Sequence, residues 1–185
     1  AVGLRYFMDE DSGSIAEFLT PDLRPLPGAG GVRREVGHQC EWAWLLLEEA
    51  GLSGDPAPGI PAARLMDFAN SCGFATDGPL EGAAVDAVSS KGAVMEDSFL
   101  LWPQTEAIKM LAARHTAGDP HAGDRARALL CVMFERWFKD RPTFVNQLDA
   151  QGNNQWSEAL TRLMYHIVLA LTEGARAGLW SSLSR

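Results

Sequence analysis

Stretches of apolar residues at helical spacing, separated by long segments rich in glycine and proline, organise this chain of 185 residues. The pattern predicts helices over residues 1–9, 38–51, 60–72, 102–117, 119–139 and 158–173. Residues 21–37 hold three prolines and four glycines, which predicts a long irregular loop. A chain built in this way folds by packing helices in pairs, with loops of unequal length connecting them.

One segment departs from the helical pattern. Two short valine-containing runs, 84–88 and 93–95, flank a turn that ends at Gly92, so we expect a β-hairpin over 79–95. We find no internal sequence repeat. The expected fold class is therefore all-α with one short hairpin, and residues 174–185 are expected to form a loosely held tail. Paired helices of this length are the building units of helical toroids and solenoids.

Composition excludes several functional classes. The formal net charge of −8 argues against nucleic acid as the main partner, and the absence of any run of 18 apolar residues argues against a membrane span. Three widely spaced cysteines, Cys40, Cys72 and Cys131, indicate reduced thiols in a cytoplasmic protein. The sequence starts without methionine and without a signal-peptide pattern, so we expect it to begin inside a helix.

The first cluster with chemical potential is Gly37-His38-Gln39-Cys40-Glu41. His38 and Glu41 are three residues apart at a predicted helix start, so both can face a common cleft. In the alternative interpretation, His38 caps the helix and Glu41 favours its dipole. A zinc site would need a second histidine beside this pair, and Trp42-Ala43-Trp44 offers no ligand, so we expect no metal.

The second cluster pairs Trp102 with Glu106, four residues apart at another helix start. An aromatic ring can cover the C–H face of a sugar, and a carboxylate can accept hydrogen bonds from its hydroxyl groups. Alternatively, Trp102 is a hydrophobic anchor and Glu106 is solvated. These two residues alone do not decide between a sugar site and a packing role.

The third cluster places Arg162 and His166 four residues apart in the last predicted helix. A nearby guanidinium favours the neutral imidazole, which is the form that a general base requires. The alternative is a core histidine that bonds to a backbone carbonyl. We interpret His115 and His121 as surface residues, and the sequence contains neither a Gly-x-Ser-x-Gly motif nor a phosphate-cradling glycine loop.

The order of these blocks resembles a known family. Gly37-His38-x-x-Glu41-Trp42-Ala43-Trp44-Leu45-Leu46, then Trp102-Pro103-Gln104-Thr105-Glu106-Ala107, then Asn146-Gln147-Leu148-Asp149-x-x-Gly152, and then Tyr165-His166 are similar to the N-acylglucosamine 2-epimerase superfamily. Within it, the chain looks most like the branch of D-mannose isomerase and related aldose–ketose isomerases. Val36 and Cys40 depart from the usual residues at their positions.

The resemblance implies an (α/α)6 toroid with a central active site and no required cofactor or metal. It implies that His38 and His166 are the two catalytic histidines and that Glu41, Trp102 and Glu106 line the sugar pocket. We add Arg162 to the expected substrate contacts. Our assignment makes His166 the base at C2 and His38 its acid/base partner, and the reverse assignment stays open.

The matched blocks belong to about the second half of a family chain. Residues 1–185 are therefore expected to form the C-terminal portion of a single (α/α)6 domain, with another polypeptide or a second copy covering the exposed edge. The predicted function is an aldose–ketose isomerase of the D-mannose/D-fructose type. Alternatives are a 2-epimerase for N-acylglucosamine or a related sugar, and a non-catalytic helical module that binds a sugar or a protein.

Overall fold

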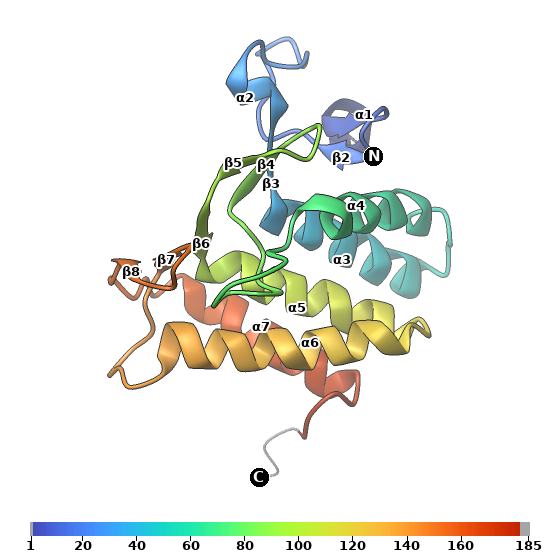
Figure 1. Ribbon diagram of the computed structural model, residues 1–185. Helices are drawn as coiled ribbons and strands as arrows, with labels where there is room; N and C mark the ends of the chain where they lie inside the picture. Colours follow the sequence, from blue (N-terminus) through green and yellow to red (C-terminus); the bar gives the residue numbers. More distant parts are fainter. Residues whose placement is uncertain (1, 182–185) are drawn as a thin grey trace.

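The computed structural model describes residues 2–181, and its long helices agree with those expected from the sequence. They are α3 (Val36–Ser53), α4 (Gly59–Cys72), α5 (Leu101–Thr116), α6 (Pro120–Met133) and α7 (Leu163–Arg176) (Figure 1). Two short helices, α1 (Val2–Phe7) and α2 (Ala29–Val32), precede them, and α6 continues into a π-helical turn, η1 (Phe134–Phe138). The start of α7 lies at Leu163 rather than at residue 158.

The prediction of a single hairpin is wrong, because the described residues form three small antiparallel sheets. One sheet pairs β1 (Met8–Asp9) with β2 (Ser14–Ile15). The second has the order β3 (Arg33–Glu35), β4 (Ala87–Ser89) and β5 (Val94–Glu96), and it contains the expected hairpin. The third has the order β6 (Ser98–Leu100), β7 (Gln147–Asp149) and β8 (Asn154–Trp156). Strands of two or three residues are too short to show alternation in a sequence.

The predicted irregular loop over 21–37 is correspondingly wrong in its second half. That segment contains α2 and β3, and it ends in the first turn of α3. Strand β3 forms by pairing with β4, a strand of the expected hairpin that lies more than fifty residues away in sequence. A pairing over this separation leaves no local signal in the sequence.

Helix α5 lies at the centre of the helical layer. It packs against α3 on one side and against α7 on the other, while α4 covers α3 and α6 covers α5 (Figure 1). The sharp start of α6 has a local cause, since the side chain of Asp119 accepts hydrogen bonds from the backbone N–H groups of His121 and Ala122 and Pro120 occupies the first turn.

The chain contains a structural repeat that its sequence does not reveal. A first unit runs β3–α3–α4–β4–β5, and a second unit runs β6–α5–α6–β7–β8. The strand registers correspond, because Arg33 faces Ser89 in the first unit and Ser98 faces Asp149 in the second. Both hairpins also have a register shift at their second pair of strands. Each unit therefore delivers its first long helix directly from an edge strand.

Two buried glutamines hold the starts of these helices in the same way. The Gln39 side chain pairs with the backbone N–H and carbonyl of Ile15 at 2.8 and 3.0 Å. The Gln104 side chain pairs with the backbone N–H and carbonyl of Ala84 at 2.7 and 2.8 Å. Each side-chain amide thus makes the pair of hydrogen bonds that a neighbouring strand would make. Gln39 fixes strand β2 against the first turn of α3, and Gln104 fixes the segment before β4 against the first turn of α5.

The expected loose tail over 174–185 is held in its first part. Leu179 is only 5% exposed, and the indole N–H of Trp180 donates to the carbonyl of Leu171 at 2.8 Å. Residues 174–176 form the last turn of α7, and Leu179 and Trp180 are held against the rest of the fold, which corrects that part of the prediction. Residues 182–185 lie outside the described part of the chain.

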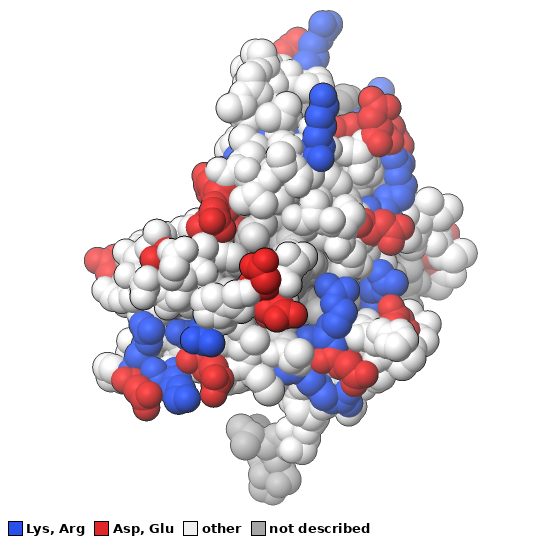
Figure 2. Space-filling view, viewed as in Figure 1, with Lys and Arg blue, Asp and Glu red and all other residues white. Residues whose placement is uncertain are grey.

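The helices, the surface charges and the cysteines can each be compared with what the composition predicts. Among residues 2–181, no helix combines the length and the apolar character needed to cross a membrane. Acidic and basic side chains are interspersed on the face shown in Figure 2, and basic residues do not gather there into a single stripe. Cys40, Cys72 and Cys131 are free, and burial raises the pKa of the Cys40 thiol.

Candidate active site

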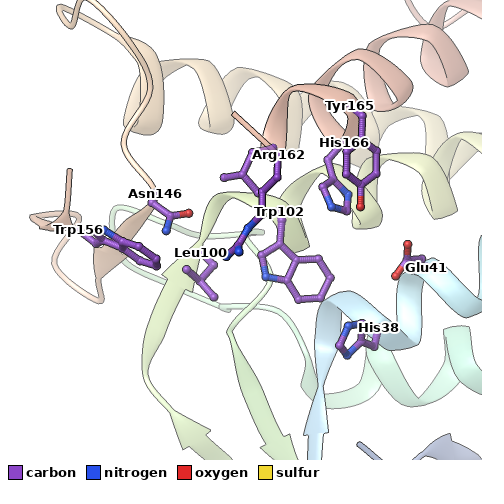
Figure 3. A pocket seen from close by; sticks show the side chains of 10 residues that line it. His38, Glu41, Leu100, Trp102, Asn146, Trp156, Arg162, Tyr165 and His166 are labelled. Carbon is purple, nitrogen blue, oxygen red and sulfur yellow. The ribbon is translucent and has the colours of Figure 1, made fainter. Parts of the chain in front are cut away.

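The N-terminal ends of α3, α5 and α7 converge on a cavity of about 310 Å³ (Figure 3). His38 and Glu41 come from α3, Trp102 from α5, and Arg162, Leu163, Tyr165 and His166 from the start of α7. Leu100, Asn146 and Trp156 complete the lining from the second unit's sheet. The volume lies at the small end of the range for ligand sites, roughly 300–1,000 Å³.

His38 is held by two carboxylates. Its Nδ1 lies 2.7 Å from Glu17 Oε2 and 3.3 Å from Glu35 Oε2. The other oxygen of Glu17 accepts from the backbone N–H of Glu35 at 2.8 Å, which fixes the carboxylate in place. Because a carboxylate can only accept, Nδ1 carries the hydrogen, and Nε2 is left for a substrate.

The surroundings of His38 favour its protonated form. Burial lowers the pKa of this imidazole, but the hydrogen bond and charge of Glu17, with the charges of Glu35 and Glu41, outweigh that effect and raise the pKa above its usual value. A raised pKa suits a group that donates a proton near neutral pH.

His166 is held by a carboxylate that is itself paired. Its Nδ1 lies 2.6 Å from Glu106 Oε1 on α5, and Glu106 Oε2 lies 2.6 Å from the ammonium of Lys109. Tyr165 stacks against the imidazole at 3.9 Å between ring centroids. Here too the bond to Nδ1 leaves Nε2 for proton exchange.

Trp102 separates the two histidines. Its ring centroid lies 4.8 Å from that of His38 and 6.0 Å from that of His166. The close approach depends on Gly37, because a Cβ at that position would lie 2.4 Å from the Trp102 ring. The resulting floor is apolar in its centre and flanked by two proton-exchanging groups.

Glu41 adds a carboxylate to the wall of the cavity. Burial, followed by the negative charge of Glu106, raises the pKa of Glu41 above its usual value. Its place one turn after His38 agrees with the expected shared face of α3.

The end of the cavity farthest from the histidines is rich in hydrogen-bond donors. Asn146 is 2% exposed, and its side-chain Nδ2 has no hydrogen-bond partner within the described residues. Its backbone is fixed, because its N–H donates to Trp156 and its carbonyl accepts from Leu101. Arg162 and the Trp156 ring lie beside it (Figure 3).

One group of side chains has the composition of a metal site. Ligand atoms of Glu17, Glu35 and His38 lie within 4.8 Å of one another. Each is already engaged, since Glu17 and Glu35 contact the imidazole and Arg33 pairs with Glu35 at 3.2 Å. The arrangement serves to hold the histidine, and we assign no metal to it.

The structure brings five of the six residues singled out from the sequence to the cavity wall: His38, Glu41, Trp102, Arg162 and His166. It corrects the sixth. Glu106 was expected to contact a sugar or to be solvated, but its side chain is 0% exposed and is occupied by Lys109 and His166. Glu106 therefore holds the His166 imidazole and does not itself line the cavity.

Sequence reasoning missed several residues of the site. Glu17 lies 21 residues before His38 in a loop, and no spacing rule connects the two. Lys109 had a usable signal, because a lysine three residues after Glu106 on an apolar helix face has an obvious partner. Asn146 and Tyr165 fall within the motif blocks but were not chosen as site residues.

Fold and site together define a class: a helix-rich protein whose helix starts present two carboxylate-held histidines and a tryptophan to a small cavity. The chain belongs to the N-acylglucosamine 2-epimerase family (GlcNAc 2-epimerase), whose model matches residues 2–170. The family resemblance inferred from the motif order is thereby confirmed.

Named relatives support this membership. The chain is 30% identical over 174 residues to a protein of Rhizobium meliloti (strain 1021) named mannose-6-phosphate isomerase, covering 90% of this chain and 44% of that one. Cellobiose 2-epimerase from Bacillus thermoamylovorans B4167 is similar in structure, with a TM-score of 0.83 at 15% identity over 98% of this chain and 48% of its own. A crystal structure of D-mannose isomerase has a TM-score of 0.78 at 18% identity over 95% and 48%. The structural likenesses show a shared fold, and the chain spans about half the length of these relatives.

Proposed function

We propose that this chain carries the acid–base site of a carbohydrate isomerase that interconverts an aldose and a ketose of the D-mannose/D-fructose type. The observation that carries the proposal is the pair of histidines flanking Trp102, each held through Nδ1 by a carboxylate. Both imidazoles therefore direct their exchangeable nitrogen away from the protein partners that hold them. Proton transfer next to a sugar carbonyl requires two such groups.

In the proposed reaction, His166 Nε2 removes the proton from C2 of the open-chain aldose. The electron pair forms the C1–C2 double bond of a cis-enediol, and the carbonyl oxygen takes a proton from His38. His166, whose proton exchanges with solvent, then delivers a proton to C1. The O2 hydroxyl gives its proton to His38, so that the C2 carbonyl of the ketose forms and both histidines return to their starting states. The raised pKa of His38 supports its role as the donor. The positive ends of the converging helices favour the negative charge that develops on the enediol oxygens.

The donor-rich end of the cavity is proposed to hold the rest of the sugar. Arg162 and the unpartnered amide of Asn146 can donate to hydroxyl oxygens, and Trp156 offers a ring face for C–H groups. A guanidinium at this end also suits a phosphate ester. D-mannose and D-mannose 6-phosphate should therefore be compared directly.

The second candidate is a sugar 2-epimerase. The likeness to cellobiose 2-epimerase favours it, since the same base at C2 serves either reaction. The two differ in where the proton returns: to C1 in an isomerase, and to the opposite face of C2 in an epimerase. A binding module without catalysis remains the third interpretation.

The test uses the natural polypeptide with any residues that flank this chain. Incubation with D-mannose in deuterated water should give a ketose with deuterium at C1, whereas epimerisation gives a second aldose with deuterium at C2. We expect His38→Ala and His166→Ala each to lower turnover by about 100-fold or more. His121→Ala, an exposed histidine outside the cavity, is the matched control. Unchanged turnover in both site variants would contradict the mechanism, and no turnover by the wild-type protein on any aldose would leave the binding module as the better explanation.

We further propose that the described helices form about half of an (α/α)6 toroid and that a complementary polypeptide or a second copy covers its open edge. Met164 and Val168 on α7 are exposed, and an apolar hollow of about 600 Å³ lies between Leu171 and Trp180. The chain also covers only 44–48% of the relatives described above. A monomer in sedimentation experiments that does not associate would count against this arrangement.

A further inference from the structure

A buried ion pair lies directly beneath the cavity. Lys109 and Glu106 are three residues apart on α5, their ammonium and carboxylate are 2.6 Å apart, and the two side chains are 1% and 0% exposed. A buried lysine costs several kcal/mol in lost hydration unless its charge is balanced. An apolar side chain at position 109 would fill the same space without this cost. A role of the Lys109 charge in the chemistry of the site would explain why a lysine occupies the position.

The ammonium of Lys109 contacts side chains of two helices, Glu106 on α5 and Trp44 on α3. Its Nζ lies 4.0 Å from the centroid of the Trp44 ring on α3, in a cation–π contact. The carboxylate that it neutralises offers its other oxygen to His166 Nδ1 at 2.6 Å. Lys109, Glu106 and His166 thus form a linear network that ends at the cavity.

The two histidines of the site differ in this respect. His38 faces the carboxylates of Glu17 and Glu35, and although burial lowers the pKa of its imidazole, the Glu17 hydrogen bond and these negative charges outweigh burial and raise that pKa. The carboxylate that holds His166 has a buried cation at the same distance as the imidazole itself. One histidine is surrounded by excess negative charge, and the other by a neutral pair.

We propose that Lys109 is a positioning residue that keeps Glu106 ionised and balances its charge, so that His166 is held as a neutral imidazole with hydrogen on Nδ1 and a free lone pair on Nε2. Glu106 then orients the ring without stabilising its protonated form. The inference rests on the proposed role of His166 as the base, and it explains how one site maintains a base and an acid from the same residue type.

Other charged and titratable groups also face His166. They come from every helix that packs around it: Glu106 and Lys109 on α5, His38 and Glu41 on α3, and Arg162 and Tyr165 at the start of α7. Only Lys109 is both a cation and buried in contact with Glu106. Removing it should therefore change the protonation of His166 more than any exposed charge does.

The test is nitrogen NMR of the four histidine rings in the wild-type protein, with His166 assigned by its loss in His166→Gln. At pH 7.5 we expect the His166 signals of a neutral ring with hydrogen on Nδ1. An imidazolium, or a neutral ring with hydrogen on Nε2, would overturn the proposal without any variant. This readout does not need turnover, so failure of the proposed activity and failure of this inference are distinguishable.

Variants sharpen the test. In Lys109→Met, the Glu106–His166 pair should take up a proton in place of the lost charge. At pH 7.5, His166 should then give the signals either of an imidazolium or of a neutral ring that carries its hydrogen on Nε2 against a protonated Glu106. Lys109→Arg should preserve the wild-type pattern. Lys91→Met, which removes an exposed lysine at the β4–β5 turn, controls for net charge. Unchanged His166 signals in a folded Lys109→Met protein would contradict the proposal.

Discussion

The two β–α–α–β–β units share a backbone plan, but equivalent positions do different work. Glu41 occupies the sixth position of α3, and Glu106 occupies the sixth position of α5. Glu41 lines the cavity, whereas Glu106 is buried and paired with Lys109. The residue equivalent to Lys109 in the first unit is Trp44, and the two are in contact. The same helix position therefore lines the cavity in the first unit and holds a buried ion pair in the second.

In a second pair of equivalent residues the roles of the two units are exchanged: the residue of the first unit is structural, and the residue of the second unit lines the cavity. Asp86 precedes β4 and accepts the backbone N–H of Val36 on its carbonyl, as Asn146 before β7 accepts that of Leu101. Both carboxylate oxygens of Asp86 accept hydrogen bonds from the protein, whereas Nδ2 of Asn146, which lines the cavity, has no hydrogen-bond partner in the described part of the chain. In each pair, the member whose carboxylate is held by other protein side chains stabilises the fold, and the other faces the cavity.

The largest contrast is expected between Glu106→Gln and Glu41→Gln. Removing the Glu106 charge leaves the buried Lys109 ammonium without its counterion, and we expect a loss of about 3–5 kcal/mol in the free energy of unfolding. Glu41→Gln should change stability by less than about 0.5 kcal/mol. Because burial raises the pKa of Glu41, the folded protein binds the proton more tightly than the unfolded chain does, so the carboxylate costs stability above its pKa and the neutral glutamine should not lower stability at pH 7. Urea unfolding at pH 7 measures the free energy of unfolding of each variant. Equal midpoints for Glu106→Gln and Glu41→Gln would contradict the structural role given to Glu106 alone.

The sequence predicted the long helices because their apolar periodicity is local, and it predicted that His38 and Trp102 lie at helix starts. It placed His166 in the interior of the last helix, which in the structure begins only at Leu163. It did not predict the repeat, because the correspondence lies in hydrogen-bond geometry. Gln39 and Gln104 make equivalent bonds, but the residues around them differ, as Cys40 and Thr105 illustrate. Glu17 was equally inaccessible to sequence reasoning, since its role depends on a loop that folds back onto α3.

The burial of Glu106 was the main error about the site. The family resemblance implies that Glu106 lines the sugar pocket, but the ammonium of Lys109, three residues later on α5, pairs with its carboxylate in the core. An Asp or Glu with a basic residue three positions later on an apolar helix face deserves that test first, because burial of both charges is then possible.

An intermediate effect is expected for Asp86→Ala against Asn146→Ala. The Asp86 carboxylate accepts from the Ser98 hydroxyl at 2.6 Å, the Leu100 N–H at 2.6 Å and the Gln147 amide at 2.9 Å, so its loss leaves partly buried donors without this acceptor. We expect a cost of about 2–3 kcal/mol in thermal or urea unfolding. Asn146→Ala should cost less than about 1 kcal/mol, since its Nδ2 has no hydrogen-bond partner among residues 2–181, and it should instead raise KM for the sugar. A stability loss in Asn146→Ala as large as in Asp86→Ala would show that both positions are structural.

The smallest contrast concerns the two hairpin turns, where the units are most alike. Gly92 and Gly152 have φ of 81° and 79°, and the residue three positions before each, Ser89 or Asp149, accepts the same pattern of turn hydrogen bonds. Alanine at either position should cost about 1 kcal/mol, because a side chain disfavours this backbone conformation.

Surroundings should then separate the two turn variants. A Cβ at Gly92 would lie 3.1 Å from the Cβ of Cys72, whereas the nearest atom to one at Gly152 lies 3.8 Å away on Pro79. Gly92→Ala should therefore unfold at the lower denaturant concentration. Gly51→Ala, within α3 and with open space around it, is the control, and it should raise stability by about 0.5–1 kcal/mol through helix propensity. If Gly152→Ala were the more destabilised of the two, the close packing of the first turn against α4 could not be what distinguishes the units at this position.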